Sequence, residues 1–154
     1  NLNQIFTGVE SDLELVIIKK DAQIIKNDLP PIFGIPLQMH QVFYNLINNA
    51  LKFSRTDVRP TITLSSSIEE NASGEAYHHI IVEDNGIGFN PAFNDKMFGV
   101  FFRLNAKDKF EGPGLGLALC RKIVNRHRGR IYAEGEEGRG AKFHIELPVE
   151  IKKI

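Results

Sequence analysis

The sequence predicts an α+β fold, a two-layer sandwich in which three helices cover one face of a mixed, mostly antiparallel sheet. Segments with apolar residues at helical spacing predict the helices, and pairs of strands joined by short loops predict the sheet. Because hairpins join most strands, a doubly wound α/β fold fits the order of elements less well. The length of 154 residues matches one domain, residues 1–154.

The N-terminal part is expected to be mainly helical. Residues 3 to 20 predict one amphipathic helix, with Ile5, Val9, Leu13, Val16 and Ile17 on its apolar side. Two short extended pieces follow, at Gln23 to Ile25 and at Pro31 to Phe33. Pro36 stands where a helix tolerates proline and opens a second helix that runs to about Phe53. Its apolar stripe consists of Met39, Val42, Phe43, Leu46, Ala50 and Phe53.

Strand patterns dominate the rest of the chain. Thr61 to Ile68 alternates polar and apolar residues, which predicts a half-buried strand followed by a hairpin loop at residues 69 to 76. The apolar run at residues 80–82 predicts a central strand that is covered more fully than its neighbours. The remaining expected elements are a helix from Leu115 to His127 and strands at Arg130 to Glu134 and Ala141 to Leu147.

Charge and cysteine content exclude several classes of protein. Nineteen basic residues balance nineteen acidic ones, so the chain lacks the positive field that nucleic-acid or anionic-lipid binding requires. Cys120 is the only cysteine, which excludes a disulfide framework and favours a reducing compartment, with the thiol packed in the core. Without a membrane-length apolar run or a signal peptide, we expect a cytoplasmic domain, and the start at Asn1 suggests a fragment of a longer protein.

A polar stripe on the second helix is the first candidate site. Asn45, Asn49 and Lys52 recur three to four positions apart, so that two amides and an ammonium share one side of the helix. An amide oxygen suits Mg²⁺ when phosphates supply the other ligands, and lysine adds a charge for those phosphates. The alternative is a solvated helix face, although asparagine is a poor helix former.

A carboxylate with two glycines follows the most apolar strand, in the segment Asp84-Asn85-Gly86-Ile87-Gly88. Glycines allow backbone to approach a ligand closely, and a buried acceptor such as Asp84 could accept a hydrogen bond from an exocyclic amine. The alternative is an ordinary turn after a strand, which such sequences also form.

A glycine-rich loop leads into the third helix. In Gly112-Pro113-Gly114-Leu115-Gly116, free amide groups and the positive helix end would form an anion site. No strand precedes the loop, so it is no dinucleotide fingerprint, and the chain has no P-loop. The preceding segment, residues 89 to 110, holds six of the eleven phenylalanines without periodicity, which indicates a functional loop. Together the three candidate sites describe a magnesium nucleotide.

Four segments carry a resemblance to a known family. They are "HQVFYNLINNALKFS" (40 to 54), "DNGIGF" (84 to 89), "MFGVFFRL" (97 to 104) and "GPGLGLALCRKIV" (112 to 124). They resemble the N, G1, F and G2 boxes of the catalytic ATP-binding domain of two-component sensor histidine kinases, and "GRIYAEGEEGRGAKFHIELP" (129 to 148) resembles its final hairpin. Any one box is permissive, but four in this order form a specific signal.

The resemblance implies the ATP-binding sandwich shared with gyrase, heat-shock chaperone and mismatch-repair ATPases. It implies that Asn49 holds Mg²⁺, that Asn45 and Lys52 contact the ATP phosphates, and that Asp84 accepts from the adenine amine. It further implies a mobile ATP lid from about Asn90 to Gly112. The backbone contacts to the nucleotide would come from Gly86, Gly88, Gly112, Gly114, Leu115 and Gly116.

The resemblance also implies what lies outside the chain. None of the five histidines lies in a phosphoacceptor context, so the substrate histidine would belong to a separate dimerisation domain, with a response regulator downstream. The chain would thus be the catalytic domain of a protein histidine kinase, which itself contacts neither nucleic acid nor membrane, although its parent can be membrane-anchored. The competing hypotheses are an autonomous ATPase or serine kinase of the same fold, and a degenerate nucleotide-binding module that signals by docking.

Three positions depart from the family pattern. Pro113 replaces a small hydroxyl residue and removes one amide, and Ile35 stands where an acidic helix cap is common. Ala141 replaces a hydroxyl residue beside the adenine. These departures bear on nucleotide affinity more than on the identity of the domain.

Overall fold

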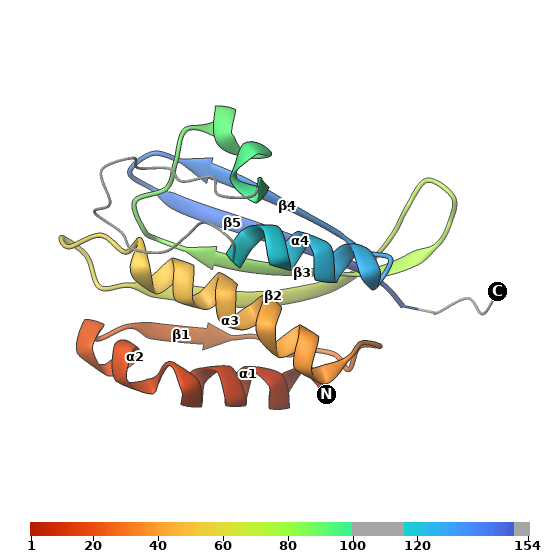
Figure 1. The fold of residues 1–154 in the computed structure, drawn as a ribbon, viewed down its shortest axis with the longest axis horizontal. Coiled ribbons are helices and arrows are strands. Elements are labelled where there is room, and N and C mark those ends of the chain that lie inside the picture. Colours follow the sequence, from red (N-terminus) through yellow and green to blue (C-terminus); the bar gives the residue numbers. More distant parts are fainter. Residues whose placement is uncertain (100–115, 150–154) are drawn as a thin grey trace.

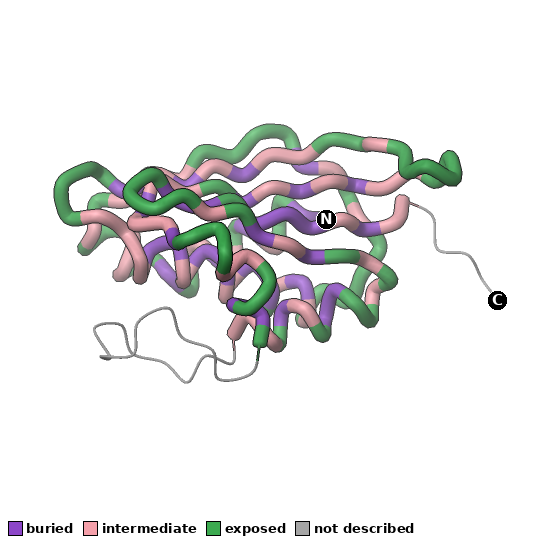
Figure 2. The backbone as a smooth tube through the Cα atoms, turned by 90° about the horizontal axis from the view of Figure 1, so that it is seen from above, coloured by how far each residue is buried: buried purple, intermediate pink, exposed green. Residues whose placement is uncertain are grey.

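The computed structural model describes residues 1–99 and 116–149. In these ranges the chain forms a five-stranded sheet with strand order β1-β2-β3-β5-β4 and four α-helices on one of its faces (Figures 1 and 2). The α+β sandwich expected from the sequence is therefore confirmed.

The sheet is mixed, as predicted. The strand β1 runs parallel to β2, and all other neighbours are antiparallel. The strands are β1 (Gln23–Lys26), β2 (Thr61–Glu70), β3 (Ala76–Asp84), β4 (Arg130–Glu136) and β5 (Gly140–Pro148). The pairing aligns Asp84, the last residue of β3, with Ala141 near the start of β5.

The helices are α1 (Leu2–Asp12), α2 (Glu14–Lys20), α3 (Pro36–Lys52) and α4 (Gly116–Arg126), with short 3₁₀ turns η1 (Pro91–Phe93) and η2 (Lys96–Phe98). The prediction of one N-terminal helix was wrong, because the chain bends at Leu13, where φ is −103° and ψ is 9°. Leu13 is buried, and only Asp21 and Ala22 separate α2 from β1. The end of α2 must therefore reach the edge of the sheet, a requirement that local periodicity does not contain.

Two further expectations about strands were wrong. Residues 31 to 33 form no strand, because Pro31 cannot donate a ladder hydrogen bond. The strand β3 is central, as predicted, but it is covered more fully than β2 only and not than β5: His78, Ile80 and Val82 are buried while Ile81 between them is not. Since helices cover only one face, even this apolar run alternates, and β5 is the more buried strand.

The core fills the space between the helices and the sheet. Phe6 on α1 and Phe43 on α3 pack with ring centroids 4.6 Å apart, and Ile80 of β3 and Ile145 of β5 belong to the same core. Cys120 on α4 belongs to this core, as expected, and burial raises the pKa of its thiol to about 12. Within the described ranges, no helix is long and apolar enough to cross a membrane.

Candidate functional site

The polar stripe of α3 meets the start of α4. The Asn45 side chain donates from Nδ2 to the carbonyl oxygen of Gly116, the first residue of α4, at 3.4 Å. A Cβ on Gly116 would lie 3.6 Å from Asn45 Cγ, which is ordinary contact. Two motifs separated by 71 positions in the sequence are thus adjacent in space.

Asn49 lies one turn further along α3, on the same stripe. Its side chain is half-buried, and no residue of the described ranges hydrogen-bonds its carboxamide. Lys52 follows in the last turn, with its Nζ 5.8 Å from the centroid of the Phe53 ring. An amide oxygen that no described residue hydrogen-bonds, with a lysine three positions further along the same helix, fits a hard cation held together with phosphates.

Asp84 ends β3 at the same end of the molecule. Burial raises the pKa of its carboxyl group to about 6, although hydrogen bonds from the backbone of Gly86 and of Ala141 favour the ionised form. The Gly86 amide donates to Oδ1 at 2.9 Å. A carboxylate that is poorly solvated and fixed at a strand end is suited to accept a hydrogen bond from a neutral donor.

The glycines after Asp84 pack against the chain itself. A Cβ on Gly86 would lie 2.5 Å from the carbonyl oxygen of Phe53, and one on Gly88 would lie 2.0 Å from that of Glu136. Gly88 also has a φ of +64°, which favours glycine. The close approach that these glycines permit is therefore to the protein backbone, while their contact with a nucleotide remains a prediction.

Backbone hydrogen bonds clamp this loop on two sides. The Ile87 amide donates to the Phe53 carbonyl at 2.9 Å, and the Gly138 amide donates to the Ile87 carbonyl at 2.8 Å. The end of α3 and the β4–β5 turn thus hold the loop that follows Asp84. As a result, the stripe on α3, the carboxylate of β3 and the start of α4 share one end of the sheet.

Two residues of this clamp were missed by the sequence reasoning. Asn85 accepts from the Thr61 amide at 2.8 Å and donates to the Arg59 carbonyl at 3.0 Å. Arg55 donates to the Gly138 carbonyl at 3.0 Å while Asp57 holds its guanidinium. The Asn after a strand was a local signal for a side-chain-bonded turn, but nothing near Arg55 indicates its distant partner.

Several predicted residues lie outside the described ranges. These are Gly112, Pro113, Gly114 and Leu115, together with the part of the expected lid from residue 100 onward. The first part of that segment is described. Phe89 and Phe98 are buried there, and the Arg121 guanidinium lies 4.4 Å from the centroid of the Phe98 ring while pairing with Asp95 at 2.8 Å.

Comparison with known proteins agrees with this arrangement. Residues 34–151 match the family described as "Histidine kinase-, DNA gyrase B-, and HSP90-like ATPase". Because this match spans most of the chain, the protein belongs to that family. The ATP-binding sandwich that the sequence motifs implied is thereby confirmed.

Its curated relatives include a phytochrome and a sensor protein kinase. The chain is 40% identical over 133 residues to cyanobacterial phytochrome A of Nostoc sp., covering 86% of this chain and 17% of that protein. It is 42% identical over 120 residues to the sensor protein kinase WalK of Staphylococcus saprophyticus, covering 75% of this chain and 18% of that protein. The chain therefore spans less than a fifth of the length of these relatives.

Solved structures place it among histidine kinase catalytic domains. The catalytic domain of histidine kinase ThkA matches with a TM-score of 0.76 and 27% identity, covering 97% of this chain and 93% of that one. Full-length ShkA, solved in complex with AMPPNP, matches with a TM-score of 0.77 and 23% identity, covering 99% of this chain and 31% of that one. The second likeness shows the fold alone.

Proposed function

We propose that this domain binds Mg-ATP and transfers the γ-phosphate to a histidine on a separate dimerisation domain of its parent sensor kinase. The observation that carries the proposal is the meeting of the α3 stripe with the start of α4, where Asn45 contacts Gly116. Family membership and relatives that are sensor kinases support it. On this proposal the domain acts in the cytoplasm, within a phosphorelay that continues to a response regulator.

The donor set fits a magnesium nucleotide. Asn49 would hold Mg²⁺ through the amide oxygen that no described residue hydrogen-bonds, and Asn45 and Lys52 would contact the phosphates. The Asp84 carboxylate would accept a hydrogen bond from the adenine amine. Its Oδ1 already accepts a hydrogen bond from the Gly86 amide. When bound, Mg²⁺ would neutralise charge on the phosphates, and catalysis would consist mainly of positioning and charge stabilisation.

The stripe favours transfer to a histidine over hydrolysis. In ATPases of this fold that use water, a glutamate one turn before the metal asparagine serves as general base, and here that position is Asn45. An amide accepts no proton at neutral pH, and general-base help is typically worth about 10² to 10⁴ in rate. A histidine imidazole is already a nucleophile, so it has less need of such a base.

Labelled ATP tests the proposal. The domain alone, the dimerisation domain of its parent alone and their mixture are incubated with γ-labelled ATP and Mg²⁺. We expect acid-labile, base-stable label on the dimerisation domain only in the mixture, and slow phosphate release by this domain alone. Brisk release by the lone domain would instead favour an ATPase, and tight ATP binding without transfer would favour a docking module.

A further inference from the structure

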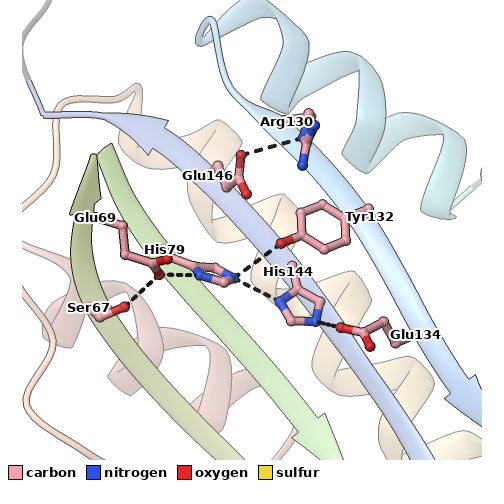
Figure 3. A network of polar contacts seen from close by, with 8 residues as sticks. All are labelled: Ser67, Glu69, His79, Arg130, Tyr132, Glu134, His144 and Glu146. Atoms are coloured by element: carbon pink, nitrogen blue, oxygen red, sulfur yellow. Dashed lines mark hydrogen bonds and ion pairs between the residues drawn. The ribbon is translucent and has the colours of Figure 1, made fainter. Parts of the chain in front are cut away.

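Two histidines face each other on the helix-free side of the sheet. His79 on β3 and His144 on β5 join a polar network with Glu69 of β2 and Glu134 of β4 (Figure 3). In the described part of the chain the α-helices lie on the opposite face (Figures 1 and 2). The network is therefore separate from the nucleotide site, and the proposed function makes no use of it.

The four side chains form one line of contacts across four adjacent strands. Nδ1 of His79 contacts Oε2 of Glu69, which also accepts a hydrogen bond from the hydroxyl of Ser67. Nε2 of His79 lies 2.8 Å from Nδ1 of His144, and Nε2 of His144 lies 2.6 Å from Oε1 of Glu134. Each imidazole thus has one nitrogen facing the other ring and one facing a carboxylate.

A count of protons shows what this line requires. The hydrogen bond from His79 to Glu69 needs a proton on Nδ1, and the contact between the rings needs one proton in total. Nε2 of His144 makes no hydrogen bond but lies in ion-pair distance of Glu134, where a proton on the nitrogen attracts the carboxylate and a lone pair repels it. The line therefore needs three protons, whereas two neutral imidazoles carry two. Without the third proton, either two lone pairs meet between the rings or a carboxylate faces a lone pair.

The glutamates are poor alternative carriers of that proton. The hydrogen bonds from His79 and Ser67 lower the pKa of Glu69, so its carboxylate is ionised at neutral pH. The Glu134 side chain is 61% exposed, and water stabilises an ionised carboxylate. The additional proton therefore belongs on a ring.

We infer that His79 is an imidazolium and His144 a neutral imidazole protonated at Nε2, so that the pair binds one shared proton between two carboxylates. In this state His79 donates to Glu69 and to His144, and the protonated Nε2 of His144 faces the Glu134 carboxylate as an ion-pair contact. No contact of the line then sets two lone pairs against each other. Two ionisable groups this close titrate as a pair, in two separate steps.

A second proton is opposed by the surroundings. Burial lowers the pKa of His144, an effect that Glu134 counters, and the charge on His79 lowers it further, as does that of Lys142 on β5. The remaining ionisable groups near the pair are Tyr77 of β3, with Arg130 and Tyr132 of β4 and Glu146 of β5. Arg130 and Glu146 pair with each other at 3.4 Å, so they add little net charge.

The stability that the His79–His144 contacts contribute should depend on pH. Raising the pH past the first step removes the shared proton and breaks one of the three contacts. Lowering it past the second step places two N–H groups against each other between the rings. The cross-strand contacts should therefore stabilise the domain most between the two steps, and less on either side.

Nitrogen-15 NMR of the imidazole rings in the intact chain tests the inference, with His127 as an internal reference. His127 has its tautomer set by the backbone, because Nδ1 faces the Ile123 carbonyl at 2.8 Å and Nε2 accepts from the Ile35 amide at 3.0 Å. Between the steps we expect His79 protonated on both nitrogens and His144 on Nε2 alone, opposite to His127. Two neutral rings throughout pH 6 to 8, a range that includes the ordinary pKa of about 6.5 for histidine, would overturn the inference. So would an Nδ1–H tautomer of His144.

Glutamine variants provide a second readout. Glu69→Gln removes one negative charge beside His79 with little change of shape, and should move the first proton uptake to lower pH. Glu136→Gln, on β4 and paired with Arg139 rather than with a histidine, should leave it unchanged. Equal titration in both variants would overturn the inference.

Zinc addition tests whether the His79–His144 pair binds a metal ion instead of a proton. Among the described residues, no group of three or more His, Cys, Asp or Glu side chains is arranged to hold a metal. One equivalent of Zn²⁺ added after chelator removal should therefore leave the ring signals of both histidines in place. Selective loss of the His79 and His144 signals would show a metal site and overturn the inference.

Discussion

At the loop end of the sheet, Asn49 keeps a carboxamide that no described residue hydrogen-bonds, whereas on the helix-free face His79 has a partner at each ring nitrogen. Both regions are polar and partly buried. The difference is that the region of Asn49 leaves hydrogen-bonding groups available for a ligand. In the region of His79 the side chains contact one another, and they need only a shared proton. Polar residues alone therefore do not mark a ligand site, and what distinguishes it is polar atoms that the protein leaves unpaired.

The largest expected effect concerns the loop that holds Asp84. Gly88→Ala would place a Cβ 2.0 Å from the Glu136 carbonyl oxygen at a φ of +64°, and should reduce the free energy of unfolding by about 3 kcal/mol or more. Gly74→Ala is the matched control, because Gly74 has a φ of +78° but nothing within 4 Å of its Cβ position. It should cost about 1 to 2 kcal/mol. Urea denaturation measures both, and equal costs would show that the loop can move away from β4.

Substitution of Asn49 separates affinity from stability. We expect Asn49→Ala to reduce Mg-dependent ATP affinity more than about 100-fold, since it removes a proposed metal ligand itself rather than a residue that orients one. Stability should hardly change, because alanine is the better helix former. Asn48→Ala, on the same helix and also half-buried, is the control. Titration calorimetry with and without Mg²⁺ decides, and unchanged affinity in Mg²⁺ would remove Asn49 from the metal site.

Asp84 should recognise the adenine base of the nucleotide. Asp84→Asn replaces a carboxylate acceptor by an amide and should weaken adenine nucleotide binding by about 1 to 3 kcal/mol. Competition between ATP and GTP measures the effect. If the two nucleotides bind to the variant as they bind to the parent chain, adenine is not recognised at this position.

The same carboxyl group should also make stability depend on pH. Its pKa is raised from 3.8 to about 6 in the folded chain, so the folded state binds the proton more tightly than the unfolded state. The resulting stabilisation is complete below the unfolded value and is lost as pH rises through about 6. Thermal melts from pH 4 to 7 should therefore show a smaller loss for Asp84→Asn than for the parent chain. Parallel curves would contradict the raised pKa.

Local patterns in the sequence were enough for most elements of the fold. The stripe from Met39 to Phe53 defines α3, and alternation at Thr61 to Ile68 defines most of β2, because side chains repeat every 3.6 residues in a helix and every two in a strand. The candidate residues Asn45, Asn49 and Asp84 were found in the same way, since their spacing and position at element ends are local properties. The segment from residue 100 to 115, including the glycines of the expected lid, lies outside the described ranges, so those expectations remain predictions.

What local patterns did not contain is the contact between distant segments. The bend at Leu13, the one-sided burial of β3 and the clamp by Arg55 on Gly138 depend on where the sheet edge, the helix layer and the β4–β5 turn lie. The same holds for His79 and His144, which are 65 positions apart and which sequence reasoning left unpaired. Their proximity follows from strand order and register, because β5 pairs with β3 although α4 and β4 lie between them in the sequence. Residue type and spacing could thus name candidate groups for a nucleotide site, but only the assembled sheet could bring together groups that contact one another.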